Sequence, residues 1–180
     1  MMWFVGAFLW GAAEATFFFI VPDVLLTLAA LRFGWKRALM LSAVAALAAA
    51  LAGLFMWRWG HDDIATAQFV LLLVPAVGPD LLQRAAHEMS AGWPLHLITG
   101  GVTGLPYKLY AAEAGALDIE MFSFAIVSFA ARFLRFAITV SLAAGGSRIA
   151  DAIGHPRWIY AGWAMAWIAV YALYFTSRMA

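Results

Sequence analysis

Gly104-Leu105-Pro106-Tyr107-Lys108 interrupts an apolar stretch of the sequence and places a cation directly after the interruption. Proline ends or kinks a helix, and a charge at membrane depth is costly unless it is paired or faces water. An earlier interruption, Val21-Pro22-Asp23, has the same form and carries the opposite charge. The two interruptions therefore predict where helices break and where a polar site lies.

The composition predicts an integral membrane protein. Of the 180 residues, 66% are hydrophobic and 12% are charged, and the mean hydropathy is +0.88. Soluble domains carry about 25% charged residues. The net charge of +1 argues against nucleic acid as the main partner, and the absence of cysteine excludes disulfides and cysteine-ligated metals. Ala13-Glu14-Ala15 resembles a signal-peptide cleavage site, but Glu14 interrupts the apolar run, so we expect this segment to be retained.

The hydropathy pattern predicts an all-α polytopic membrane protein with a single membrane domain, residues 1–180. A bilayer core about 30 Å thick needs about 20 helical residues. Three plain spans are expected, at 38–57, 119–143 and 158–176. The segments 1–31 and 94–117 each consist of a helix, a break and a half-helix, which we interpret as two re-entrant hairpins. Backbone freed at their tips must face protein or a watery cavity.

The remaining segment, 64–93, is expected to lie at the membrane interface. Its first part, 64–78, is short for a span and contains Pro75, while residues 79–91 have the period of an amphipathic surface helix. If 64–78 does not cross, the chain divides into two inverted repeats. A gapless offset of 84 residues superimposes Pro22 on Pro106, and broken segments at matching places in two halves indicate a transporter-type site.

Four charged residues at membrane depth are candidates for this site. Glu14 and Asp23 must be protonated, paired or hydrated there, and Asp23 has the alternative of capping the half-helix that follows Pro22. Arg132 and Arg135 lie three residues apart on one helix face and need a partner, unless they reach the interface. If the partner is part of the protein, it is a carboxylate. If the partner is a bound ligand, it is a phosphate group.

Lys108 opens a half-helix whose exposed amides already favour an anion. A structural role for Lys108 would instead need an acidic partner, and Glu113 is a poorly spaced candidate for it. Pro22, Pro106 and Tyr107 complete the candidate residues. No motif predicts a metal, a cofactor or an enzyme: His61-Asp62-Asp63 lies in a polar segment, and His87-Glu88 lacks a zinc protease's second histidine. The basic loop 32–37 is expected to face the cytoplasm.

Several of these residues resemble the DedA family, also called the VTT or SNARE-associated domain. They are Glu14 with Pro22-Asp23, Leu105-Pro-Tyr-Lys108, Ala114-Gly115, and Ser128-Phe-Ala-Ala-Arg132-Phe-Leu-Arg135-Phe. The resemblance spans roughly Gly11 to Ala144. It implies two oppositely oriented re-entrant hairpins, essential carboxylates at Glu14 and Asp23, and a basic residue at Lys108. Many members have a second arginine where this chain has Val102, so Arg132 or Arg135 would have to supply that charge.

The resemblance implies a multi-pass inner-membrane transporter that flips or scrambles a phosphate-bearing lipid, either a polyprenyl phosphate or a phospholipid, with protons as the coupling ion. Its partners would be membrane lipids, and a homo-oligomer is left open. Two alternatives stand beside this hypothesis. The first is a proton-coupled transporter of a small ion or osmolyte. The second is a non-transporting scaffold in which the buried charges only fix helix packing.

Overall fold

A computed structural model describes residues 1–152 and 158–179, with the side chains of residues 102 and 177–179 outside the description. Seven helices and no strand occur within this part of the chain, as the composition predicts. The helices are α1 (Met2–Glu14), α2 (Asp23–Phe33), α3 (Trp35–Leu71), α4 (Pro79–Thr103), α5 (Tyr107–Ala116), α6 (Met121–Ala152) and α7 (Trp158–Met179).

Three of these helices are long and apolar enough to cross a bilayer: α3, α6 and the Trp158–Thr176 part of α7. They overlap the three predicted spans and support a membrane protein. α3 and α6, with 37 and 32 residues, exceed the roughly 20 residues that a span requires. Both helices are therefore longer than a single span requires.

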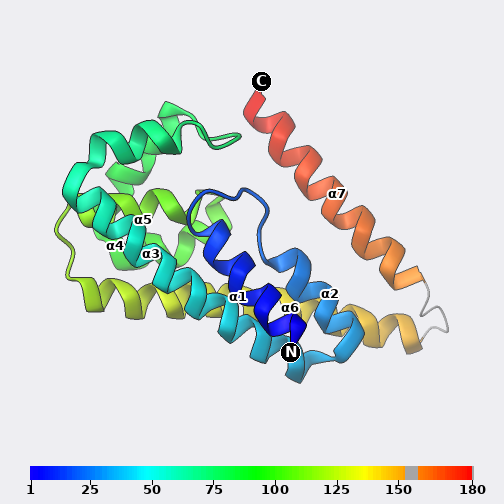
Figure 1. The fold of residues 1–180 in the computed structure, drawn as a ribbon. Helices are drawn as coiled ribbons and strands as arrows, with labels where there is room; N and C mark the ends of the chain where they lie inside the picture. Colours follow the sequence, from blue (N-terminus) through cyan, green and yellow to red (C-terminus); the bar gives the residue numbers. More distant parts are fainter. Residues whose placement is uncertain (153–157, 180) are drawn as a thin grey trace.

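The first break separates α1 from α2. Residues 15–22 are not helical, and the chain then turns back so that the start of α1 lies beside the end of α2 (Figure 1). The rings of Trp3 and Phe33 accordingly meet edge to face, with 5.0 Å between their centroids. The indole of Trp10, on α1, donates a hydrogen bond to the carbonyl of Ile20 in the break at 2.9 Å. This bond satisfies one backbone group that the interrupted helix leaves free.

The second break separates α4 from α5. α4 ends at Gly104, whose φ of 80° is a left-handed conformation that glycine adopts at low cost. Pro106 follows at the N-cap position of α5, where its missing N–H is not needed. α4 also bends at Gly92, so the predicted surface segment 79–91 and the segment leading to the break form separate helical pieces.

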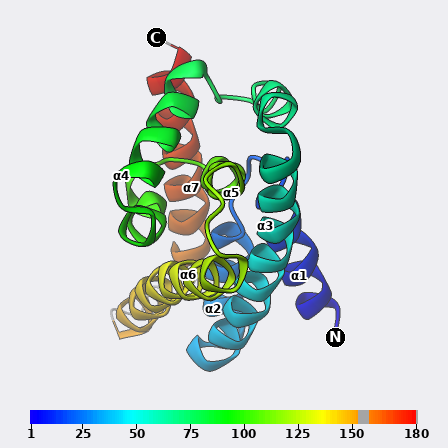
Figure 2. The ribbon, with the colours of Figure 1, turned by 90° about the vertical axis from the view of Figure 1, so that its left-hand side faces the viewer.

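α5 is the most enclosed helix of the fold. Seen nearly end-on, it lies between α3 and α4 and above α6 (Figure 2), and every residue from Tyr107 to Gly115 is buried. Glycines permit this close approach: a Cβ at Gly60 would overlap the backbone of Ala112, and one at Gly115 would overlap the backbone of Trp57. The indole of Trp57 also donates to the carbonyl of Ile119 at 2.9 Å.

The short helices pack on the long helices α3 and α6. α2 packs on both α3 and α6, whereas α5 packs on α3, and α3 and α6 pack on each other. α2 begins at Asp23 and α5 at Tyr107, which are separated by the 84-residue offset seen in the sequence. Each short helix has a proline at its N-cap position. The element order α1–α2–α3 is thus repeated in α4–α5–α6.

α3 and α6 both continue past the ends of the predicted spans, 38–57 and 119–143, through polar segments. Arg58 to Asp62 continues α3, supported by an ion pair of 2.8 Å between these two residues, one turn apart. The helix is interrupted only at Asp63, whose carboxylate accepts from the N–H of Thr66 at 3.0 Å and so caps the next helical piece. Likewise, α6 continues through Gly145 to Ala152 rather than ending in a loop; residues 153–157 lie outside the described part.

A methyl group at Gly60 should disrupt the α3–α5 contact. We expect Gly60→Ala to lower the thermal midpoint of the purified protein, because the added Cβ meets backbone rather than a movable side chain, and overpacking costs about 1–3 kcal/mol. Gly162→Ala on α7 is the matched control, since nothing lies within 4 Å of that Cβ. It should leave the midpoint unchanged or raised. Equal midpoints for both variants would contradict the close packing of α5.

Candidate functional site

One cavity of about 360 Å³ lies between the two breaks. Its lining includes all five charged candidates from the sequence: Glu14, Asp23, Lys108, Arg132 and Arg135. They come from α1, α2, α5 and α6. Residues far apart in the chain are therefore brought to one chamber, as the opposite charges of the two breaks predict.

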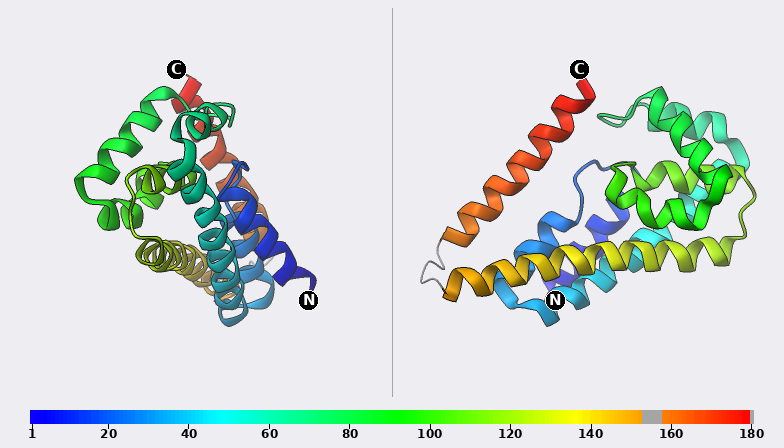
Figure 3. Two further views of the ribbon diagram at one scale, coloured as in Figure 1. Left: turned by 60° about the vertical axis from the view of Figure 1, so that its left-hand side comes forward. Right: turned by 180° about the vertical axis from the view of Figure 1, so that it is seen from behind.

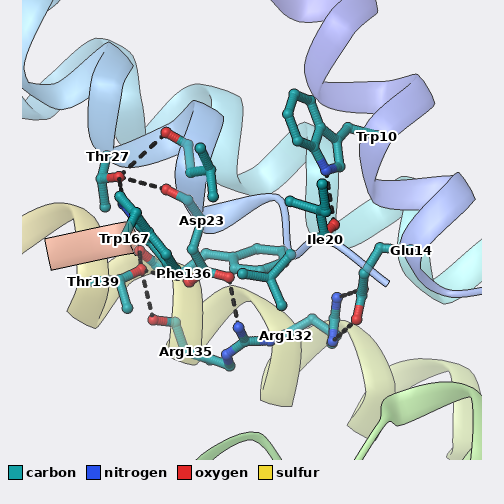
Figure 4. Close-up of polar contacts among 12 residues, drawn as sticks. Trp10, Glu14, Ile20, Asp23, Thr27, Arg132, Arg135, Phe136, Thr139 and Trp167 are labelled. Carbon is teal, nitrogen blue, oxygen red and sulfur yellow. Dashed lines mark hydrogen bonds and ion pairs between the residues drawn. The ribbon is translucent and has the colours of Figure 1, made fainter. Parts of the chain in front are cut away.

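Glu14 and Arg132 form a buried, bidentate ion pair. Both guanidinium Nη atoms donate to the Glu14 carboxylate, one of them at 3.4 Å, and each residue is only 5% exposed. Figure 4 shows Arg132 reaching from α6 to Glu14 at the end of α1 (Figure 4). Each of these two buried charges therefore has a partner of opposite charge within the protein.

Asp23 and Arg135 form the second pair, one turn away on α6. Arg135 Nη2 donates to Asp23 Oδ2 at 2.6 Å, and the hydroxyl of Thr139 donates to Asp23 Oδ1 at 2.9 Å (Figure 4). Asp23 is fully buried, and the side chain of Arg135 is 21% exposed. The alternative that Asp23 caps α2 is wrong, because the N-cap position is held by Pro22 and both carboxylate oxygens of Asp23 accept from side chains of α6.

Arg132 is also enclosed by aromatic rings. Its guanidinium carbon lies 5.0 Å from the ring centroids of both Tyr107 and Phe136, which is within cation–π range. Its Nε is buried without a hydrogen-bond partner. Arg132 thus links the first break, through Glu14, to the start of α5, through Tyr107.

Lys108 differs from the arginines because no carboxylate in the described part of the chain forms an ion pair with it. Its Nζ donates one hydrogen bond, to the carbonyl of Phe18 in the first break, at 2.7 Å. The residue is 2% exposed. Glu14 attracts the ammonium and Arg132 repels it, but Glu14 is already engaged by Arg132. An ammonium can donate three hydrogen bonds, so Lys108 retains capacity that faces the cavity.

The additional candidates divide into two groups. Pro106 and Tyr107 line the cavity, whereas Pro22 and Glu113 are not among its lining residues. Glu113 does not pair with Lys108; it accepts from the amide of Gln68 on α3 at 2.7 Å. The predicted Glu113–Lys108 alternative is therefore wrong. The side chain of Val102 lies outside the described residues.

Uncharged polar residues of α7 form hydrogen bonds to residues at the first break and on α2. They were not among the residues predicted from the sequence, because that prediction relied on charged residues. The hydroxyl of Tyr171 accepts from the backbone N–H of Val21 at 2.8 Å. The indoles of Trp163 and Trp167 donate to the hydroxyl of Thr27 at 2.9 and 3.2 Å. Trp163 and Trp167 lie within the apolar run 158–176, where an uncharged indole gives no signal of a polar contact.

The polar cluster around His61 has a structural explanation. His61 Nδ1 lies 2.7 Å from Asp118, and Asp62 pairs with Arg58. No group of three or more residues able to hold a metal ion occurs in the described part of the chain.

Comparison with known proteins leaves the family open. No family model matches the chain, and no solved structure matches it. The chain is similar to an uncharacterized protein of Haemophilus influenzae, with 28% identity over 163 residues. The match covers 89% of this chain and 82% of that protein.

The Glu14–Arg132 pair should behave as one unit in stability measurements. We expect Glu14→Gln and Arg132→Gln each to lower the thermal midpoint strongly, because removing one partner of a buried pair costs about 3–5 kcal/mol. The double variant should recover much of the loss, since it leaves no unpaired charge. Arg58→Gln is the control, because its pair is 67% and 49% exposed and is worth about 0.5 kcal/mol. Additive losses in the double variant would exclude the pairing.

Proposed function

We propose that this protein is a membrane transporter that moves an anionic, phosphate-bearing lipid, with the headgroup held in the cavity at Lys108. The observation that carries the proposal is the buried ammonium of Lys108, whose one hydrogen bond goes to a backbone carbonyl. Burying a charge without a counter-charge is costly. A site that retains such a cation beside open volume is suited to an anion.

The charge balance of the cavity supports an anionic ligand. Its lining holds two carboxylates and three basic side chains, and the carboxylates are taken up by Arg132 and Arg135. Lys108 therefore leaves one positive charge uncompensated. A phosphate monoanion would neutralise it, and hydrogen bonds to charged groups are each worth about 1.5–3 kcal/mol.

The architecture supports a transporter with inverted repeats. We propose that α1–α2 and α4–α5 are the two re-entrant hairpins, entering from opposite faces and meeting at the cavity. The contacts of α2 with α6 and of α5 with α3, each joining one half to the other, fit a pseudo-two-fold relation between the halves. Transporter sites often lie where such broken helices meet.

The class we propose is the DedA family, on the motifs at Glu14, Asp23, Lys108, Arg132 and Arg135. Membership would make this a multi-pass inner-membrane protein whose partners are membrane lipids and protons. The substrate would be a phospholipid or a polyprenyl phosphate. In this assignment Arg132 serves in place of the arginine that many members have at the position of Val102.

The carboxylates have a role in the proposed cycle. Glu14 and Asp23 hold the arginines in ion pairs. Protonation of Glu14 would release Arg132, which could then contact the phosphate in bidentate fashion. Loss of that proton would restore the ion pair and expel the headgroup, which couples lipid movement to protons.

A scaffold without transport activity is the second candidate. It is favoured by the pairing of four of the five cavity charges inside the protein, which is sufficient to explain their burial. The small-ion alternative shares the cavity geometry and is separated from lipid movement by the assay below.

Lys108→Gln should slow lipid translocation roughly 10- to 100-fold, which corresponds to the loss of one charge-assisted hydrogen bond. The measurement follows fluorescent phosphatidic acid across the membrane of liposomes that contain the purified protein. Lys108→Arg keeps the charge and should retain activity. The matched control is Lys36→Gln, which removes the chain's other lysine from an exposed position and should behave as the unmodified protein does.

Each outcome separates the candidates. Lipid movement at the unmodified rate in both Lys108→Gln and Glu14→Gln would exclude the assigned site. Flux of a soluble anion without lipid movement would favour the small-ion transporter. A protein that moves neither, and that tolerates joint replacement of all four paired charges by apolar residues in cells, would be a scaffold.

A further inference from the structure

Part of the cavity lining is apolar or aromatic and comes from two helices. α4 contributes Leu97 and Ile98, and α7 contributes Trp167, Val170, Tyr171 and Tyr174. The five charged side chains line the same cavity. The cavity is therefore amphiphilic, with charged groups and hydrocarbon or aromatic surface both in its lining.

Two residues of this wall face both the cavity and the outside of the protein. Ile98 is 42% exposed and Val170 is 51% exposed, although both line the cavity. Buried lining residues such as Leu97 lie further in, at 4% exposed. Ile98 and Val170 therefore mark an aliphatic part of the rim where the cavity meets the outer surface. In a bilayer, that surface on α7 faces lipid, since α7 is apolar and its spanning segment is not buried in the fold.

α7 is joined to the first break by hydrogen bonds. The bonds from Val21 to Tyr171 and from Trp163 and Trp167 to Thr27 connect it to α2 and the segment before α2. α7 packs on α2 and α6, and its C-terminal end comes near the connection between α3 and α4 in both opposing views (Figure 3). α7 therefore borders the cavity from the side of the first break.

The volume of the cavity limits what it encloses. At about 360 Å³, it lies at the lower end of the range of roughly 300–1,000 Å³ for small-molecule pockets. It can hold a polar headgroup, whereas a long hydrocarbon chain must lie outside. An apolar opening at the rim would let the hydrocarbon chain remain in the bilayer. No polar group of the protein would then be buried against hydrocarbon.

We infer that the rim between Ile98 and Val170 is a lateral portal that holds the hydrocarbon tail of an anionic amphiphile while the headgroup lies at Lys108. The inference rests on the proposed function and assigns a place on the protein to the tail of the proposed lipid. A soluble phosphate of the same headgroup chemistry would enter the cavity without contacting the portal. Head and tail recognition are therefore separable by experiment.

The chain has no cysteine, so single cysteines can be modified selectively. Val170→Cys and Ile98→Cys place a thiol at the portal; Leu173→Cys and Leu95→Cys are controls on the same two helices. These leucines are 70% and 64% exposed and do not line the cavity. Each variant is measured before and after reaction with N-pyrenylmaleimide, which fills the portal with a bulky ring system.

The binding experiment uses phosphatidic acid in detergent micelles and glycerol phosphate as the tailless probe. At the two portal positions, modification should weaken phosphatidic acid binding at least tenfold relative to the same variant before reaction. Glycerol phosphate binding should change less than twofold. At Leu173 and Leu95, modification should change neither affinity more than twofold. Lys108→Gln should weaken both ligands at every position.

Three results would overturn the inference, and they can be told apart from failure of the proposed function. Unchanged phosphatidic acid binding after modification of both portal positions would exclude the portal and leave the Lys108 site intact. Equal losses for glycerol phosphate would mean that the reagent blocks the headgroup site rather than a tail exit. If the unmodified protein binds neither ligand, the headgroup site fails and the portal fails with it.

Discussion

Two buried ion pairs between the first break and α6 are the constraint on which the site depends. Arg132 and Arg135 project from one face of α6, and at depth in a membrane each would be unstable alone. Glu14 and Asp23 can reach them only because the chain breaks between α1 and α2 and turns back. The break brings the two carboxylates to the two arginines, and each arginine is tolerated there because a carboxylate pairs with it. Lys108 completes the cluster from the other half of the chain.

The two halves use different means to hold their short helices. α2 is held to α6 by the Asp23–Arg135 pair. The 84-residue offset superimposes Arg132 and Arg135 on Ala48 and Leu51 of α3, so the matching surface for α5 has no charge. There the contact depends on small residues, with Gly53 and Gly60 facing Tyr107 and Ala112. An ion pair thus holds α2, whereas close packing against small residues holds α5. The polar groups are therefore distributed unequally between the two halves, although the order of the elements repeats.

Much of the fold and most of the candidate site could be predicted from the sequence because the signals are local and strong. Proline followed by a charge within an apolar run marks both breaks, and the i, i+3 spacing of the arginines predicts their common face. The continuation of α3 through Arg58–Asp62 was not predicted, because polarity suggested a loop, whereas an ion pair one turn apart supports a helix. The contribution of α7 was also missed. Tyr171 and Trp167 act through neutral hydrogen bonds to partners about 140–150 positions away, and no periodicity reveals such pairs.

The central claim is that the unpaired cation at Lys108 receives the phosphate of a lipid. Its most direct measurement is an electron cryomicroscopy map of the protein in nanodiscs rich in phosphatidic acid, at a resolution that distinguishes side chains. The account predicts density for a phosphate within hydrogen-bonding distance of Lys108 Nζ, inside the chamber formed by Arg132 and Arg135. A chamber without lipid density, with Lys108 bonded only to the carbonyl of Phe18 and lipids confined to the outer surface, would contradict it.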